Sequence, residues 1–156
     1  MTRYTVNNRN TLLSIPWYVT ALTVTASSCN DNNIYGVDLS SFKFLRSVVI
    51  GNSCFQYVQL FSIVGLNWLE SVRIGEYSFG SDGSLWEGSE FKIVNCPQLK
   101  SLSIGGRSFG RYNGFELSQL SQLISVTIAS SYGYGHGFQY ARNAVFRGMN
   151  DGRDEL

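Results

Sequence analysis

A repeated segment constrains the fold of this chain more than any other feature of its sequence. Four similar segments begin 24, 30 and 24 residues apart, and all four follow the pattern L-x-S-[VL]-x-I. They are LRSVVIGNSCF (45–55), LESVRIGEYSF (69–79), LKSLSIGGRSF (99–109) and LISVTIASSYG (123–133). A sequence that resembles itself at a spacing of roughly 20 to 50 residues is typical of architectures built from stacked repeats.

Each segment follows a second shared half, so that one unit contains two short apolar patterns. In the third unit Phe91 and Ile93 alternate with polar residues, and so do Leu102 and Ile104. Alternation with a period of two predicts two half-buried strands in each unit. A single unit could not bury its apolar side, whereas stacked units align equivalent side chains in one core. We therefore expect a mostly β solenoid of about five coils, with short parallel strands on both faces and few or no helices.

The repeat also sets the boundaries of the predicted domain. The chain has 156 residues, which is the length of one domain, and we expect a single domain over 1–150 followed by a polar tail at 151–156. A degenerate N-terminal coil is predicted over 13–44, regular coils over 45–143 and a C-terminal half-coil over 144–150. The N-terminal coil is aligned by Leu13, Pro16, Val19, Leu22 and Val24, which match Leu39, Phe42, Leu45, Val48 and Ile50. The half-coil is aligned by Ala144, Phe146 and Met149, which match Phe115, Leu117 and Leu120.

The balance of charge excludes several classes of partner. Twelve Lys and Arg residues against eleven Asp and Glu residues give a net charge of +1. This lacks the basic excess that nucleic acid and anionic membranes favour, so we expect neither as a partner. The sequence contains no apolar run of about 18 residues and no signal-peptide pattern at its start, which favours a cytoplasmic location. For a fragment of a longer protein, an extracellular or cell-surface location is the alternative.

The repeat resembles a known family. L-x-S-L-x-I-G-x-x-S-F, together with an apolar-x-x-C-x-x-L step, is similar to the BspA-like leucine-rich repeats. The resemblance covers residues 13–149, with Ser47, Ser71, Ser101 and Ser125 at one repeat position. The sequence lacks the Asn that usually follows the core of a leucine-rich repeat. The resemblance implies a curved solenoid that serves as a binding scaffold, and it does not specify the ligand.

Residues that could support catalysis are scarce. The only histidine, His136, lies in a Gly- and Tyr-rich stretch without an acidic neighbour, and we interpret it as a solvated loop residue. No nucleophile elbow, phosphate-binding loop or metal-binding pair of histidines is present. We therefore expect no enzyme, no cofactor and no metal site. Cys96 occupies a position held by leucine in neighbouring units, which predicts a buried, inert thiol, and Cys29 and Cys54 are also expected to be packed.

Two groups of residues are candidates for contact with a partner. The repeated serines should form one outward-facing column across the units. Beside it lies a variable column formed by Val49, Arg73, Ser103 and Thr127. The serines could simply suit close stacking of the strands, whereas the variable column could contact a ligand. The second group lies in insertions, because the gap between Phe79 and Phe91 holds 11 residues where equivalent gaps hold five. Insertions leave a repeat stack as loops, often on its binding face.

The insertions place aromatic residues outside the repeat register. Trp86 lies in the first insertion, and Tyr132, Tyr134, Phe138 and Tyr140 lie in a later one. Exposed Trp and Tyr often dominate binding energy, although such side chains could instead fold back over the end of the core. The predicted function is a noncatalytic scaffold that binds a protein through its concave sheet and insertion loops. The alternatives are a cell-surface adhesin or glycan-binding module, and a segment of a longer array that self-associates through its end coils.

Overall fold

The chain folds into a mostly β structure with almost no helix. The computed structural model describes residues 1–81, 83–129 and 143–149. Its elements, in chain order, are β1 (Arg3–Val6), α1 (Arg9–Leu12), β2 (Ala21–Val24), β3 (Gly36–Asp38), β4 (Ser47–Ile50), β5 (Leu60–Val64), β6 (Ser71–Ile74), β7 (Trp86–Val94), β8 (Ser101–Ile104), β9 (Tyr112–Leu120), β10 (Ser125–Ile128) and β11 (Asn143–Met149).

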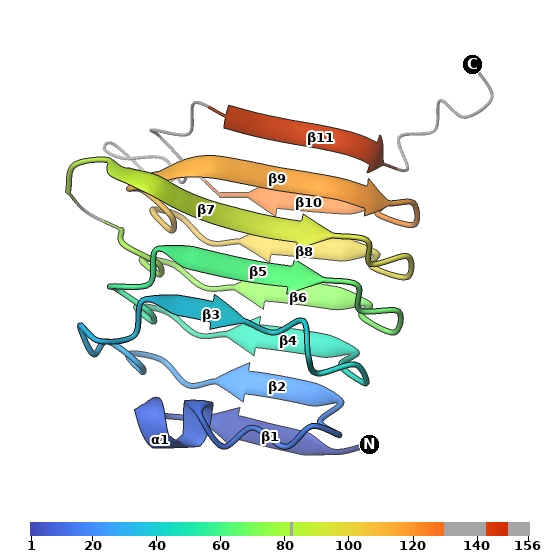
Figure 1. Cartoon of the computed structure of the whole chain (residues 1–156), viewed down its shortest axis with the longest axis horizontal. Helices are drawn as coiled ribbons and strands as arrows, with labels where there is room; N and C mark the ends of the chain where they lie inside the picture. Colours follow the sequence, from blue (N-terminus) through green and yellow to red (C-terminus); the bar gives the residue numbers. More distant parts are fainter. Residues whose placement is uncertain (82, 130–142, 150–156) are drawn as a thin grey trace.

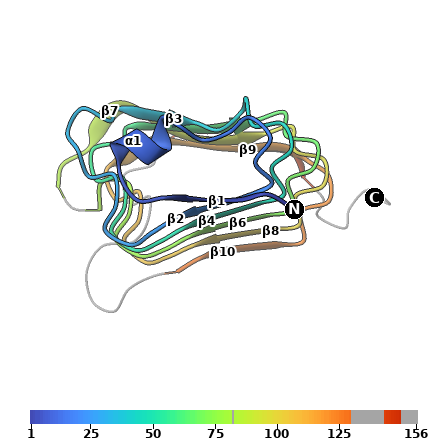
Figure 2. The same cartoon turned by 90° about the horizontal axis from the view of Figure 1, so that it is seen from below.

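The strands form two parallel sheets, between which the chain alternates from β2 onward (Figure 1). Sheet A has the order β1-β2-β4-β6-β8-β10, and sheet B has the order β11-β9-β7-β5-β3. Seen along the stack in Figure 2, the two sheets lie as two layers with the core between them. The predictions of mostly β structure and of parallel strands on two faces are confirmed.

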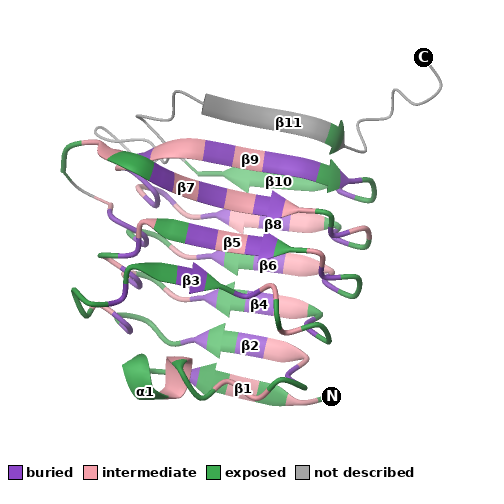
Figure 3. Cartoon of the chain, viewed as in Figure 1, coloured by how far each residue is buried: buried purple, intermediate pink, exposed green. Residues whose placement is uncertain are grey.

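Equivalent repeat positions pair directly across sheet A. Ser47 pairs with Ser71, Ser71 with Ser101 and Ser101 with Ser125. The same register carries the apolar residues that alternate with the serines, so Ile74 lies between Ile50 and Ile104. Because side chains alternate between the two faces of a strand, buried residues alternate with half-buried or exposed ones along β4 and β6 (Figure 3). The buried residues face sheet B.

Two ladders of aromatic rings fill the core between the sheets. Phe79 lies between Phe55 and Phe109, with ring centroids 5.1 and 4.4 Å apart in stacked arrangements. A second stacked ladder runs through sheet B, from Phe61 through Phe91 to Phe115, with centroids 5.4 and 5.3 Å apart. All these rings are buried. Stacking of units therefore brings identical side chains into contact, which is the source of the core's stability.

The glycine that follows β4, β6 and β8 is required by the closeness of neighbouring units. A Cβ atom on Gly105 would lie 2.5 Å from the backbone of Gly75, and one on Gly75 would lie 2.8 Å from the backbone of Gly51. Such distances are shorter than any allowed contact. The repeated I-G pair thus marks the point where the chain leaves sheet A. There the glycine packs directly against the backbone of the previous unit, and only glycine leaves enough space for this contact.

The corner after this glycine contains two left-handed residues that are not glycine. Tyr77 and Phe79 have φ angles of 57° and 58°, and Arg107 and Phe109 have 62° and 59°. This conformation is uncommon outside glycine and costs free energy. The side chain between each pair is a buried serine that bonds to neighbouring units. This turn geometry was not predicted from the sequence.

The N-terminal end differs from the expectation. β1 adds a strand to sheet A before the predicted first coil, and α1 follows it with a capping box between Asn8 and Thr11. Val19, Leu22 and Val24 occupy the core as predicted, whereas Leu13 is 67% exposed. The alignment was wrong at Leu13 because the chain there leaves a helical turn and does not form a strand in sheet B.

The first insertion is also different from the expectation. Residues 86–90 do not form a loop, because they extend β7 to nine residues, with Trp86 paired to Tyr112 of β9. A bulge between Trp86 and Glu90 takes up two of the six extra residues, and the other four lie between Phe79 and Trp86. At the C-terminal end, by contrast, β11 pairs as predicted: Ala144 with Phe115, Phe146 with Leu117 and Met149 with Leu120.

Candidate partner-binding surface

The outer face of sheet A carries the variable column predicted from the sequence. Val49, Arg73, Ser103 and Thr127 are paired in this order on β4, β6, β8 and β10. Arg73 and Thr127 are exposed and Ser103 is half-buried. The structure therefore brings Arg73, Ser103 and Thr127 together on one face, as the sequence predicted.

A strip of exposed aromatic side chains runs along the corner where the chain enters sheet A. We define the aromatic strip as Trp17, Tyr18, Phe44 and Trp68, which are 68%, 49%, 47% and 47% exposed. Trp17 contacts Tyr18 edge-on with centroids 5.3 Å apart, and it contacts Phe44 of the next unit at 5.9 Å. Exposed aromatic residues in a contiguous group are typical of protein-binding surfaces.

Arginine and glutamate side chains join the strip to sheet A. The Arg46 guanidinium lies over the Trp68 ring, 5.7 Å from its centroid, and it forms an ion pair of 3.9 Å with Glu70. Both charged side chains are about half exposed. Arg46, Glu70 and Lys100 occupy the same repeat position in three successive units, and Lys100 is also exposed. The surface therefore combines aromatic rings with a modest excess of positive charge.

The strip changes character in the last two units. The position held by Tyr18, Phe44 and Trp68 is held by Gln98 and then Gln122. There the surface has a shallow pocket of about 380 Å³, lined by Pro97, Gln98, Lys100, Ser121 and Gln122. One continuous surface thus offers aromatic contacts at one end and polar contacts at the other.

Trp86 is placed differently from the sequence hypothesis. Its ring packs against the core cluster, covers Gly80 and lies 6.2 Å from the Tyr112 ring. The Arg111 guanidinium covers it at 4.1 Å. Trp86 is therefore half-buried and extends the core, which leaves it little surface for a partner. The other predicted aromatic contacts, Tyr132, Tyr134 and Tyr140, lie outside the described residues, as does His136.

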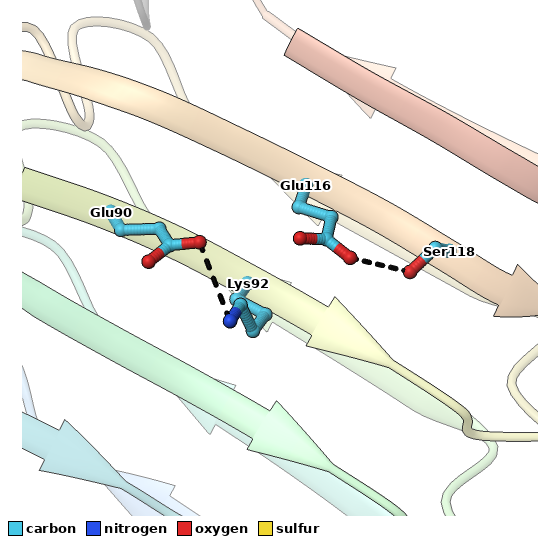
Figure 4. A network of polar contacts seen from close by, with 4 residues as sticks. All are labelled: Glu90, Lys92, Glu116 and Ser118. Atoms are coloured by element: carbon cyan, nitrogen blue, oxygen red, sulfur yellow. Dashed lines mark hydrogen bonds and ion pairs between the residues drawn. The ribbon is translucent and has the colours of Figure 1, made fainter. Parts of the chain in front are cut away.

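The outer face of sheet B is a second polar surface (Figure 4). Lys92 forms an ion pair of 3.5 Å with Glu90 on the same strand, and the Ser118 hydroxyl donates a hydrogen bond of 2.7 Å to Glu116. Further along this face, partial burial raises the pKa of the Asp38 carboxyl, but hydrogen bonds from Ser40 and Ser62 and the charge of Lys43 together outweigh it, so the pKa is lowered. These charged and hydroxyl groups pair locally. The exposed aromatic residues near sheet B, Tyr35 and Tyr57, lie at the corner before its strands, and no ring contact joins them to each other.

The cysteines fit the prediction of packed thiols. Cys29, Cys54 and Cys96 are all buried and free. Burial raises the pKa of Cys29 to about 11, with smaller contributions from Cys54 and Asp31, and burial also raises the pKa of Cys54 and Cys96. A nucleophilic thiol requires a lowered pKa, so none of the three thiols is activated.

The described residues do not assemble a metal-binding cluster. Among them, no group of three or more His, Cys, Asp or Glu side chains could hold a metal ion. Every buried side-chain nitrogen or oxygen in the same part of the chain has a hydrogen-bond partner. Nor does any described helix have the length and apolar character needed to cross a membrane.

The aromatic strip was missed in the sequence, although the repeat contained a signal for it. Tyr18, Phe44 and Trp68 each precede a buried residue of the repeat by one position, and that position is exposed in every unit. An aromatic residue recurring at an exposed repeat position was therefore visible before the structure. It was overlooked because aromatic residues are usually assigned to the core.

Comparisons with known proteins give no further guide to this surface. No family model matches the chain, and no curated protein or solved structure is significantly similar to it.

Proposed function

We propose that the chain is a noncatalytic leucine-rich-repeat scaffold, a solenoid of about five coils, that binds another protein. The contact surface is the outer face of sheet A together with the aromatic strip. Membership of the BspA-like class is part of the same proposal, and it rests on the repeated L-x-S-[VL]-x-I pattern and its neighbouring C-x-x-L step.

The aromatic strip is the observation that carries this proposal. Its four large rings remain about half exposed or more. Apolar area left in water does not contribute to the free energy of folding, so these rings do not stabilise the fold as buried rings would. Monomeric proteins seldom keep contiguous apolar patches without a function. Trp, Tyr and Arg are also the residues that most often dominate the binding energy of protein interfaces. Here Arg46 is held over Trp68, so the cation and the ring are already positioned for a partner.

The arrangement of the rings favours a protein over a glycan. The planes of Trp17 and Tyr18 meet at 89°, and those of Trp17 and Phe44 meet at 58°. A linear glycan would stack on rings that present coplanar faces, whereas tilted rings form notches into which individual side chains insert. The pocket beyond the strip, with its amide and lysine groups, adds hydrogen-bonding partners suited to a peptide backbone.

The proposal is tested by substituting the strip without disturbing the core. Trp68→Ala should reduce recovery of specific partner proteins from a lysate of the source cells by about tenfold or more, because loss of a central aromatic anchor costs at least 2 kcal/mol in many interfaces. Quantitative mass spectrometry of proteins captured on immobilised wild type and variant provides the measurement.

A matched control uses an aromatic residue of similar exposure. Tyr57 is 49% exposed but lies at the opposite corner, before a sheet B strand. Tyr57→Ala should recover the same proteins as the wild type. Equal recovery by all three proteins, or binding of the wild type to a glycan array that Trp68→Ala abolishes, would contradict the proposal.

A further inference from the structure

The last strand of sheet A leaves its inward-facing residues uncovered. Val126 is in register with Leu102, yet Leu102 is 1% exposed and Val126 is 42% exposed. In the same way Ile104 is fully buried, whereas Ile128 is 41% exposed. Figure 3 shows β10 exposed along its whole length. In the described part of the chain, no strand pairs with β10 on the side away from β8.

The sequence of β10 contains neither a charge nor a proline, the residues that most often keep edge strands apart. Residues 123–129 read LISVTIA, without a charge or a proline and with three β-branched residues in a row, Val126, Thr127 and Ile128. Natural edge strands are protected by charges, bulges, short length or a cover, and an unprotected one pairs with another chain. Because edge strands also present unpaired amide and carbonyl groups, β10 offers both hydrogen bonds and apolar side chains to an additional strand.

The other described edges carry such protection. β1 contains Arg3, and β3 has only three residues, one of which is Asp38. In β11 the pairing with β9 skips Gly148, which has a φ angle of 58°. Among the three edge strands whose burial is described, β1, β3 and β10, only β10 exposes its inward-facing apolar residues, and this asymmetry points to a specific contact at β10.

The opposite end of the stack is covered, which determines how two copies could meet. Leu12 and Ile15 pack against the core at that end, and the Tyr4 hydroxyl donates a hydrogen bond of 2.9 Å to the Thr11 carbonyl of α1. Head-to-tail stacking, with β10 of one copy against the β1 end of the next, would bring Val126 and Ile128 to an end where the core is already covered and where Arg3 lies on the edge strand. The arrangement consequently disfavours an open fibre.

We propose that β10 is the interface of a homodimer, in which the β10 strands of two copies pair antiparallel about a two-fold axis. The pairing joins sheet A of both copies into one continuous sheet. In the register centred on Thr127, Val126 of each copy lies opposite Ile128 of the other, and the two uncharged Thr127 side chains face each other without repulsion. A two-fold contact of this kind closes on itself, so the assembly stops at two chains.

The occupant is a second copy because the strand is complementary to itself. Its surface is apolar and neutral, so it offers no charge by which a differently charged partner would be selected. The proposal does not require the proposed function, which is carried by Trp17 and Trp68 at the corner of sheet A, although Thr127 also lies on the face assigned to that function.

The test is the molar mass of the chain in solution as its concentration rises. Thr127 is exposed and faces outward, so Thr127→Lys adds a charge to the edge without touching the core. Thr23→Lys is the matched control, since Thr23 occupies the same column on β2, an interior strand. Sedimentation velocity should show wild type and Thr23→Lys shifting from one chain mass to two, and Thr127→Lys should raise the dimer dissociation constant roughly tenfold.

Hydrogen exchange provides an independent readout that does not rely on a variant. The amides of Ser125 and Ala129 donate to carbonyls of the β8 side, so the alternate amides of Val126 and Ile128 point to the free edge. Their exchange should slow as concentration rises, while exchange in β2 stays constant. A wild type that remains one chain mass at every concentration overturns the proposal, as does a dimer that Thr127→Lys and Thr23→Lys leave equally stable.

Discussion

At the scale of single residues, a column of small polar side chains makes the sharp corner after sheet A possible. Ser78 is completely buried, and its hydroxyl accepts a hydrogen bond from the amide of Cys54 and donates one to the carbonyl of Gly51. Ser108 repeats these contacts one unit further along, with Ser78 and Gly75. Each hydroxyl therefore bonds to one amide and one carbonyl of the corner in the preceding unit. These backbone groups lie outside the sheets and would otherwise be buried without a partner.

This column makes a prediction about two serines of the same repeat unit. Ser78→Ala should lower the free energy of unfolding by about 1 to 3 kcal/mol, because it leaves the buried Cys54 amide without an acceptor. Ser71→Ala, on the outer face of β6, should change it by less than about 0.5 kcal/mol. Denaturant titration of both variants measures the difference, and equal losses would show that the Ser78 hydroxyl does not have this role.

The column also shows a limit of reasoning from the sequence. Ser78 and Ser108 recur at one repeat position, which Cys54 occupies in the unit before them. The recurrence itself was therefore visible in the sequence. Its role was hidden, because serine is usually exposed and its burial depends on Tyr77 and Phe79 adopting a conformation that non-glycine residues rarely adopt.

At the scale of elements, the regular strands were predictable and their extensions were not. Alternation of apolar and polar residues records which side of a strand faces the core, so β7 and β8 were located correctly around Phe91 and Ile104. The segment before Phe91 is rich in Gly and Ser, which is typical of a loop. It forms a strand because the Trp86 ring packs against Gly80 and Tyr112. Tyr112 is far from Trp86 in the sequence, and the two residues come together only in the folded chain.

The position of Trp86 can be tested against that of Trp68. Trp86→Ala should lower the free energy of unfolding by about 2 kcal/mol or more, because it uncovers the core between β7 and β9. Trp68→Ala should cost no more than about 1 kcal/mol, since it removes an exposed ring and one contact with Arg46. Thermal or denaturant unfolding compares the two variants. If Trp86→Ala were as mild as Trp68→Ala, Trp86 would belong to a loop, as the sequence alone suggested.

At the scale of the whole molecule, the two sheets divide the surface into different environments. Sheet A exposes serines, a variable column and the aromatic strip along one corner, whereas the polar residues of sheet B pair with each other. The division into two layers was predictable from two apolar patterns in each unit. The candidate surface was predicted only in part, because the repeat register placed Arg73, Ser103 and Thr127 on one face but does not distinguish exposed aromatic residues from buried ones.

The central claim is that equivalent residues of successive units lie directly over one another. Nuclear Overhauser effects between isoleucine methyl groups test it most directly, because neighbouring parallel strands are about 4.8 Å apart. In a sample labelled at isoleucine methyls, we predict cross-peaks from Ile74 to both Ile50 and Ile104, and one between Ile63 and Ile93 of sheet B. Cross-peaks that join Ile74 to neither Ile50 nor Ile104 would contradict the stacking of units, and with it the surface built upon that stacking.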